Sequence, residues 1–395
     1  MNILIYNTSE LYPKKGGVQR ISNHLAEELI LRGHNVYFMI KKRWYPEETA
    51  EIACDMYSID SDVYDEIAII RTTQILQEKN IDIVINQSYW DKDFPKFMKE
   101  NFDIPVITVI HNSPTRDFRT TTFDVNYLSN RTCVRRVKDV INIVRKPYRL
   151  HKRKKNAFYQ YKMLNDYSDK LVMLSDGFKP ELASLVKKYD EHKVCSIPNF
   201  TTFEKICDME MLANKQKVIL FVGRLDFNHK RCDRLIEIWE KIYDKYPDWK
   251  LRIAGDGPEI ENLENYVSKK NIKNVEFLGF VDPVDEYKKA KVLCMTSNFE
   301  GMPMVLIEAG LYGCVPMAFD SFASLPDVIS HNEDGIIVPS FNMKKYQQEL
   351  EKLMTDEAHL QRLSEGALKI NDKFNKEEIV DKWEDLFEEI INEKR

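Results

Sequence analysis

Two glutamates enclose a short segment that could bind a ligand carrying both phosphate and hydroxyl groups. Pro303 suits the first turn of a helix, where its missing N–H would have had no partner. The N–H groups of that turn would face a phosphate. Glu300 and Glu308 could each hydrogen-bond a diol, one on a sugar ring and one on a ribose. The segment therefore fits a nucleotide-sugar. Between the two glutamates it includes Gly301, Met302, Pro303, Met304 and Val305.

Two cations lie earlier in the same half of the chain, just after an apolar run that predicts a strand. Arg224 offers a planar fork for phosphate oxygens, and Lys230 offers a compact positive charge. His229 and Arg231 flank Lys230, so the sequence does not separate the roles of these neighbours. The alternative interpretation of Arg224 and Lys230 is a pair of surface cations near a turn.

Candidate residues in the first half also follow predicted strands. Gly16 and Gly17 lie between a strand and a helix, where glycine lets the backbone approach a ligand. His111 ends the apolar run Val106–Ile110, and α/β folds place functional groups at the carboxyl ends of strands. An ordinary tight turn and a hydrogen-bonded histidine are the alternatives. The pattern G-x-G-x-x-G is absent, so a nicotinamide dinucleotide is not supported.

Alternating strand-like runs and helical periodicity predict an α/β fold with parallel sheets. The chain has 395 residues, which is more than one ordinary core, and two series of strands divide it into two Rossmann-like domains. We expect an N-terminal domain of residues 1–199 and a C-terminal domain of 200–375, with 376–395 packing back on the first. The predicted strands are Asn2–Tyr6, Asn35–Ile40, Ile83–Asn86, Val106–His111, Lys170–Leu174, Lys217–Val222, Lys250–Ala254, Val275–Leu278, Val292–Thr296, Val315–Ala318 and Gly335–Val338.

Composition excludes several classes of protein. The net charge of −5 gives no general reason to expect nucleic-acid binding. Seven scattered cysteines, without a C-x-x-C motif, argue against a disulfide framework or a structural zinc site and for a reducing compartment. The chain opens on a strand-like run rather than a signal peptide, and no apolar run is long enough to span a bilayer.

Several motifs together resemble retaining glycosyltransferases of family 4, which have the GT-B fold of two Rossmann-like domains facing a central cleft. The nearest resemblance is to bacterial enzymes that extend lipid-linked or surface oligosaccharides. The motifs that carry the resemblance are Gly16-Gly17-Val18, His111-Asn112, Ile197-Pro198-Asn199, Val222-Gly223-Arg224-Leu225 with Lys230, Ala254-Gly255-Asp256-Gly257-Pro258, Phe277-Leu278-Gly279-Phe280 and the segment from Glu300 to Glu308.

The resemblance implies a role for each candidate residue. Arg224 and Lys230 neutralise the leaving diphosphate, Glu300 orients the donor sugar, and Glu308 binds the ribose. Gly16 and Gly17 lie over the diphosphate, and His111 lies beside the donor sugar. Backbone groups at Gly279, Phe280 and Val281 line the nucleobase pocket. The reaction implied is front-face transfer with retention, in which the leaving phosphate accepts the proton of the attacking hydroxyl.

The resemblance also implies substrates and partners. UDP is the usual carrier, GDP and ADP occur on the same motifs, and the sugar is a hexose or N-acetylhexosamine. The acceptor is a glycan or a lipid-linked oligosaccharide. Neither a cofactor nor a metal is expected: Asp60-Ser61-Asp62 and Asp91-Lys92-Asp93 match the D-x-D pattern, but neither follows a suitable strand. The alternatives are a soluble acceptor, an epimerase or phosphorylase of the same fold, and a non-catalytic nucleotide-sugar binder.

A basic stretch predicts contact with an anionic membrane surface. Between residues 131 and 155, Asp139 is the single acid, and apolar residues interleave with the cations at helical spacing. Such a helix can lie on an anionic leaflet, which favours a peripheral protein on the cytoplasmic face of the membrane. A solvated helix face or a groove for the acceptor's diphosphate is the alternative. The cations are Arg131, Arg135, Arg136, Lys138, Arg145, Lys146, Arg149, Lys152, Arg153, Lys154 and Lys155.

Overall fold

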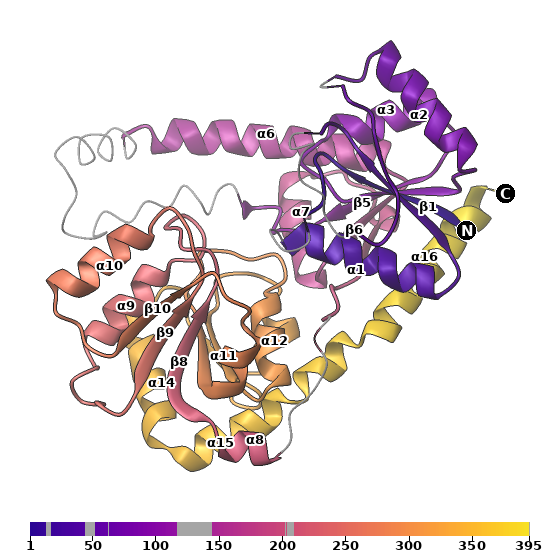
Figure 1. Ribbon diagram of the computed structural model, residues 1–395. Coiled ribbons are helices and arrows are strands. Elements are labelled where there is room, and N and C mark those ends of the chain that lie inside the picture. Colours follow the sequence, from indigo (N-terminus) through magenta and orange to yellow (C-terminus); the bar gives the residue numbers. More distant parts are fainter. Residues whose placement is uncertain are drawn as a thin grey trace. The chain divides into compact units, whose positions relative to one another are not determined.

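The computed structural model describes residues 1–12, 17–43, 52–61, 63–116, 144–201, 203 and 209–394. Within these ranges the chain forms two compact units (Figure 1). The first contains 1–115, 153–201 and 376–394. The second contains 203 and 209–375, together with 116 and 144–152. We predicted a boundary at 199/200, and the described residues of the first unit reach 201.

The first unit is built on a seven-stranded parallel sheet with the order β3-β2-β1-β4-β5-β6-β7. The central strand β1 pairs on both sides, with Ile3 opposite Val36 of β2 and Ile83 of β4. Central strands are buried on both faces, so they are continuous apolar runs. The strands are β1 (Asn2–Asn7), β2 (Asn35–Ile40), β3 (Met56–Ser58), β4 (Ile83–Asn86), β5 (Val106–Ile110), β6 (Lys170–Met173) and β7 (Val194–Ser196).

Helices cover this sheet, and the C-terminal helix returns to it from the far end of the chain. Arg32, just after α1, forms ion pairs with Asp381 and Glu384 of α16, which explains why α16 belongs to the first unit. The helices of this unit are α1 (Gly17–Leu31), α2 (Glu66–Glu78), α3 (Asp93–Asn101), α6 (Lys146–Tyr167, whose first turns belong to the second unit), η1 (Asp176–Phe178), α7 (Lys179–Leu185), η2 (Glu191–Lys193) and α16 (Lys376–Lys394).

The second unit has a six-stranded parallel sheet with the order β10-β9-β8-β11-β12-β13. Its core is formed by residues such as Ile219, Ile253 and Val292, which are fully buried. The strands are β8 (Gln216–Val222), β9 (Lys250–Ala254), β10 (Val275–Gly279), β11 (Ala290–Met295), β12 (Val315–Phe319) and β13 (Ile336–Val338). The helices are α8 (Met209–Ala213), α9 (Cys232–Glu240), α10 (Ile260–Lys269), α11 (Val284–Lys289), α12 (Met304–Leu311), α13 (Leu325–Val328), α14 (Met343–Thr355), α15 (Glu357–Ala367) and η3 (Ile370–Phe374).

Each sheet reverses its strand order at one place, and that place predicts where ligands bind. In the first unit the reversal lies between β1 and β4, and in the second it lies between β8 and β11. Loops that leave neighbouring strands there run to opposite sides of the sheet and open a crevice at the carboxyl ends. Arg224 follows β8 and Glu300 follows β11, so the second sheet brings these two candidates together.

The predicted fold class of two Rossmann-like α/β domains is confirmed, and each predicted strand is present to within about two residues. Two short edge strands, β3 and β7, were not predicted. Each has three residues and is only partly buried, so neither produces an apolar run in the sequence. Cys54, Cys195, Cys232, Cys294 and Cys314 are free thiols, and the other two cysteines lie outside the described ranges.

Candidate active site

A turn built on two glycines positions Arg224 at the carboxyl end of β8. Gly223 has φ +154° and Gly255 has φ +148°, conformations that residues with a side chain rarely adopt. The two backbones touch, since a Cβ on Gly255 would lie 1.9 Å from the carbonyl oxygen of Gly223. The N–H of Leu225 donates to the carbonyl of Asp256 at 2.9 Å, which ties the turn to the loop after β9. Arg224 therefore projects from a rigid turn, and its side chain is exposed.

The side chain of Lys230 lies against the same turn. Its side-chain carbons lie alongside Gly223, where an added Cβ would be 3.4 Å from Cδ. The loop that carries Lys230 is also bonded to the loop after β11. The N–H of Asn298 donates to the carbonyl of His229 at 2.8 Å, and Oγ1 of Thr296 donates to the carbonyl of Arg231 at 2.8 Å. These bonds join the two loops that meet at the reversal of strand order.

Glu300 is the buried anion of this site. Its Oε1 lies 2.9 Å from Nζ of Lys230, and its Oε2 lies 3.3 Å from Nε2 of His229. Burial opposes ionisation of Glu300, but the positive charge of Lys230 and the interaction with His229 outweigh it and hold the pKa of the carboxyl well below its usual value. Glu300 is therefore a carboxylate at neutral pH, a hydrogen-bond acceptor whose orientation is set by two neighbours.

The structure separates the two neighbours of Lys230 that the sequence left unresolved. Arg231 is buried and its guanidinium bonds the carboxylate of Asp233 at 2.9–3.1 Å, so it serves the start of α9. His229 instead stacks on Phe299, with ring centroids 4.4 Å apart and planes at 6°. We did not predict a role for His229, because this contact joins two loops some seventy residues apart in the sequence.

Helix α12 begins at Met304, slightly later than predicted. Pro303 is the residue before its first turn, rather than within it, and has φ −80°. Glu308 lies in the second turn, is 2% exposed, and accepts a hydrogen bond from the hydroxyl of Tyr287 at 2.9 Å. Gly301 and Met302 are buried, whereas Met304 and Val305 in the first turn are partly exposed. Tyr287 is a second residue that sequence reasoning missed, and it fixes the Glu308 carboxylate.

The other predicted site residues of the second unit lie at the end of β10. Gly279 ends the strand with φ +68°, and its carbonyl accepts a hydrogen bond from the N–H of Gly255 at 2.7 Å. Phe280 is 77% exposed and Val281 is 39% exposed. Exposed apolar side chains beside the glycine turn are consistent with a surface for a nucleobase, and this role stays a prediction.

In the first unit His111 follows β5 and is buried. Its Nε2 donates to Oε1 of Gln87 at 2.6 Å, since an amide oxygen can only accept. Burial lowers the pKa of His111 to about 4, so the imidazole is neutral at pH 7. Gly17 starts α1 with open space around its Cα, and Gly16 lies outside the described residues. Gln87 is a further residue that the sequence did not single out.

The aspartates of the two D-x-D matches have other partners. Asp91 accepts hydrogen bonds from the hydroxyls of Tyr6 at 2.9 Å and Tyr64 at 2.6 Å. Asp60 pairs with Arg71, and Asp62 lies outside the described residues. Over the ranges that the structure describes, no three His, Cys, Asp or Glu side chains are grouped so that they could hold a metal ion. Independence of metal stays a prediction.

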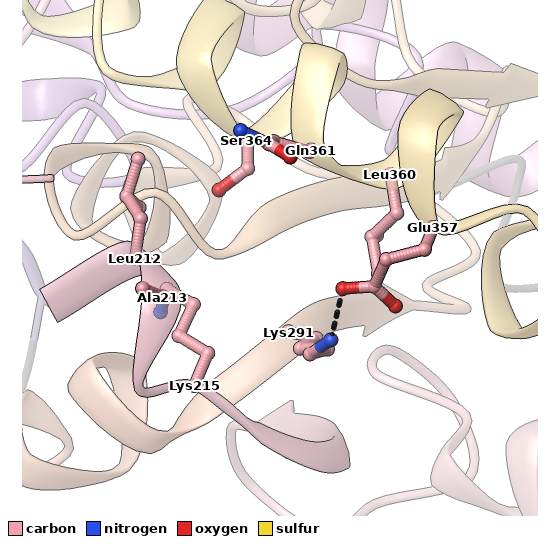
Figure 2. A pocket seen from close by; sticks show the side chains of 8 residues that line it. All are labelled: Leu212, Ala213, Lys215, Lys291, Glu357, Leu360, Gln361 and Ser364. Carbon is pink, nitrogen blue, oxygen red and sulfur yellow. Dashed lines mark hydrogen bonds and ion pairs between the residues drawn. The ribbon is translucent and has the colours of Figure 1, made fainter. Parts of the chain in front are cut away.

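Two pockets in the second unit lie at opposite ends of its strands. One, of about 210 Å³, is lined by Lys215, Lys291 and Glu357 among others (Figure 2). These residues are close to the amino ends of β8 and β11, away from Arg224 and Glu300. In it Lys291 pairs with Glu357 at 2.5 Å. The other, of about 340 Å³, is lined by Asn298, Asp320 and Phe341 among others and lies at the carboxyl ends, where α/β folds bind ligands.

Comparison with known proteins identifies the family of one segment of the chain. Residues 203–370 match the family described as glycosyl transferases group 1. This segment is a group 1 glycosyltransferase domain. It contains Arg224, Lys230, Glu300 and Glu308, so these predicted site residues all lie in the glycosyltransferase domain.

Bacterial proteins are among the curated relatives of the chain. An uncharacterized glycosyltransferase of Haemophilus influenzae is 29% identical over 220 residues, which are 55% of this chain and 61% of that protein. A Campylobacter jejuni protein named GalNAc-alpha-(1->4)-GalNAc-alpha-(1->3)-diNAcBac-PP-undecaprenol alpha-1,4-N-acetyl-D-galactosaminyltransferase is 34% identical over 179 residues. That match covers 45% of this chain and 50% of the relative. The matches thus span between half and two thirds of these relatives' lengths.

Solved structures confirm the fold of the whole chain as GT-B. Sucrose-phosphate synthase from Thermosynechococcus elongatus matches with a TM-score of 0.76 and 16% identity, covering 99% of each chain. Anabaena HepE in complex with UDP-glucose matches with a TM-score of 0.73 and 12% identity, covering 98% of this chain and all of that one. At these identities the likeness concerns the fold and not the substrate.

Half of the predicted basic stretch lies within the described residues. Residues 144–161 contain seven cations and no acid, and most of them are in the first half of α6. Ala157 is the first buried residue of this helix, while Val144, Tyr148, Phe158 and Tyr159 are exposed. No helix in the described part of the chain is long and apolar enough to cross a membrane.

Proposed function

We propose that this protein is a retaining glycosyltransferase that transfers a hexose or N-acetylhexosamine from a UDP-sugar to a lipid-linked or surface-polysaccharide acceptor. The observation that carries the proposal is the Lys230–Glu300 pair beside the exposed Arg224, at the reversal of strand order in the glycosyltransferase domain. A cation pair next to an oriented carboxylate suits a donor with a diphosphate on one side and a sugar on the other. The names of the bacterial relatives support the acceptor class.

In the proposed mechanism the protein positions the donor and stabilises charge. Arg224 and Lys230 bind the diphosphate and stabilise the negative charge that develops as the bond to the sugar breaks. Glu300 accepts a hydrogen bond from a sugar hydroxyl, and Glu308 accepts one from the ribose. The acceptor hydroxyl attacks from the side on which the diphosphate leaves, and the leaving phosphate takes its proton.

A nucleotide panel tests the donor site. We expect UDP to raise the melting temperature of the protein, and EDTA to leave this shift unchanged, because the two cations do the work that a metal would do. A ligand that binds the folded state adds RT ln(1 + [L]/Kd) of stability, about 2.7 kcal/mol at a hundredfold excess over Kd. Differential scanning fluorimetry with UDP, GDP, ADP and their sugars, each with and without EDTA, measures the shift in melting temperature. A flat response to all three nucleotides would contradict the proposed donor site.

We further propose that the protein works at the cytoplasmic face of a membrane, held by the basic half of α6. The Campylobacter relative is named for a substrate carried on undecaprenol diphosphate, a membrane lipid. Each cation near an anionic surface contributes up to about 1 kcal/mol of binding. The exposed aromatic residues Tyr148 and Phe158 on the same helix suit the interface between headgroups and acyl chains.

Vesicle flotation tests this surface. We expect the protein to float with vesicles of phosphatidylcholine and phosphatidylglycerol, but not with phosphatidylcholine alone, and to be released by high salt. Reversing the exposed Lys152, Lys154 and Lys155 to glutamate should remove binding. A control with the exposed Lys187, Lys188 and Lys241 reversed carries the same net charge and should still float. Equal loss in both triple variants would show that net charge, and not α6, governs binding.

A further inference from the structure

We propose that His229 is a positioning residue that orients Glu300 for the donor sugar, an inference that rests on the proposed function. The family match gives His229 no role, and His229 is not among the predicted site residues. It is one of two residues whose side-chain nitrogens lie near the Glu300 carboxylate, and unlike Lys230 it approaches the second carboxylate oxygen.

His229 is held by two hydrogen bonds at its backbone and by one stacking contact at its ring. The backbone N–H of His229 donates to the carboxylate of Asp226 at 2.6 Å, and the backbone carbonyl of His229 accepts from the N–H of Asn298 at 2.8 Å. The ring lies flat on Phe299. Phe299 directly precedes Glu300, so the backbone that carries the carboxylate and the ring that contacts it move together. A side chain held in this way loses little further entropy when a ligand binds.

The His229 ring has one nitrogen that faces the site. Nε2 is buried from solvent and lies 3.3 Å from Oε2 of Glu300, without the geometry of a good hydrogen bond. Lys230 holds the other oxygen at 2.9 Å. A carboxylate contacted at both oxygens cannot rotate freely, so its remaining lone pairs point in fixed directions. Oε2 is then the oxygen placed to accept a hydroxyl of the donor sugar.

This arrangement separates binding of the sugar from binding of the nucleotide. Arg224 and Lys230 contact the diphosphate that UDP and a UDP-sugar share, whereas His229 acts through Glu300 on the sugar alone. Loss of the His229 N–H should therefore weaken a UDP-sugar and leave UDP unchanged. A merely structural role for His229 would weaken both ligands together.

Three variants separate the N–H from the ring. His229→Phe keeps the stack on Phe299 and removes the donor, while His229→Gln keeps an N–H donor and removes the ring. Asn228→Ala is the matched control: its side chain is exposed, and only its carbonyl is used, as the acceptor of Nδ2 of Asn298. Isothermal titration with UDP, UDP-glucose, UDP-galactose, UDP-N-acetylglucosamine and UDP-N-acetylgalactosamine measures each affinity.

We expect His229→Phe to weaken the best UDP-sugar about tenfold, because Glu300 loses the contact that orients its Oε2, with UDP affinity unchanged. His229→Gln and Asn228→Ala should resemble the wild type. Equal UDP-sugar affinity in His229→Phe and wild type would overturn the inference, as would loss in His229→Gln with retention in His229→Phe. A parallel loss of UDP would do the same. If the wild type binds none of these nucleotides, the proposed function fails first and the inference falls with it.

Discussion

Replacing Arg224 by alanine is expected to lower turnover about 10³-fold and to leave the stability of the protein unchanged. The side chain is exposed at the end of a turn whose shape depends on glycine backbone, so its loss opens no cavity. Removing one preorganised donor to a developing negative charge costs about 10²–10³ in rate, and arginine groups that stabilise phosphoryl charge can be worth more. At 10³ the loss corresponds to about 4 kcal/mol of transition-state stabilisation.

Two further variants sharpen this test. Arg224→Lys keeps the charge but loses the planar fork, so it should retain part of the activity. Lys241→Ala removes an exposed cation at the end of α9 and should be fully active. Turnover is measured as release of UDP, with the melting temperature recorded for each variant. Full activity in Arg224→Ala would refute the assignment, while a large fall in melting temperature would make the arginine a structural residue.

The fold was predictable because parallel strands buried on both faces are continuous apolar runs. Ile83–Asn86 and Val106–Ile110 are fully buried strands, and their apolar runs predicted strands at Ile83–Asn86 and Val106–His111. The edge strands β3 and β7 could not be predicted in this way, because three partly buried residues on the margin of a sheet have the composition of a loop. Their pairing depends on neighbours distant in the sequence.

The candidate site was predictable where a residue acts by itself and unpredictable where it acts through a contact. Arg224 follows its strand directly, so its position at the carboxyl end was available from the sequence. His229 and Arg231 have similar surroundings in the sequence, one on each side of Lys230. Arg231 pairs with Asp233, two residues further along the chain, whereas His229 stacks on Phe299, seventy residues away. No local pattern in the sequence specifies the contact between His229 and Phe299.

Replacing Gly255 by alanine is expected to destabilise the second unit by more than about 4 kcal/mol, the range reached only by backbone strain or a disrupted core. The new Cβ would lie 1.9 Å from the carbonyl oxygen of Gly223, a backbone atom that cannot rotate away. At φ +148° the alanine would also be strained in itself. Both effects act on the turn that carries Arg224, so nucleotide binding should be lost with stability.

Two other glycines divide this effect into its parts. Gly279 has φ +68° with open space around it, so Gly279→Ala should cost only the backbone strain, about 1–3 kcal/mol. Gly17 has open space and a helical backbone, so Gly17→Ala should be neutral or slightly stabilising. Urea unfolding of the three glycine variants measures the order of their stabilities. If Gly255→Ala were no worse than Gly279→Ala, the close contact between the loops after β8 and β9 would not be what fixes Arg224, and a more mobile turn would have to position it.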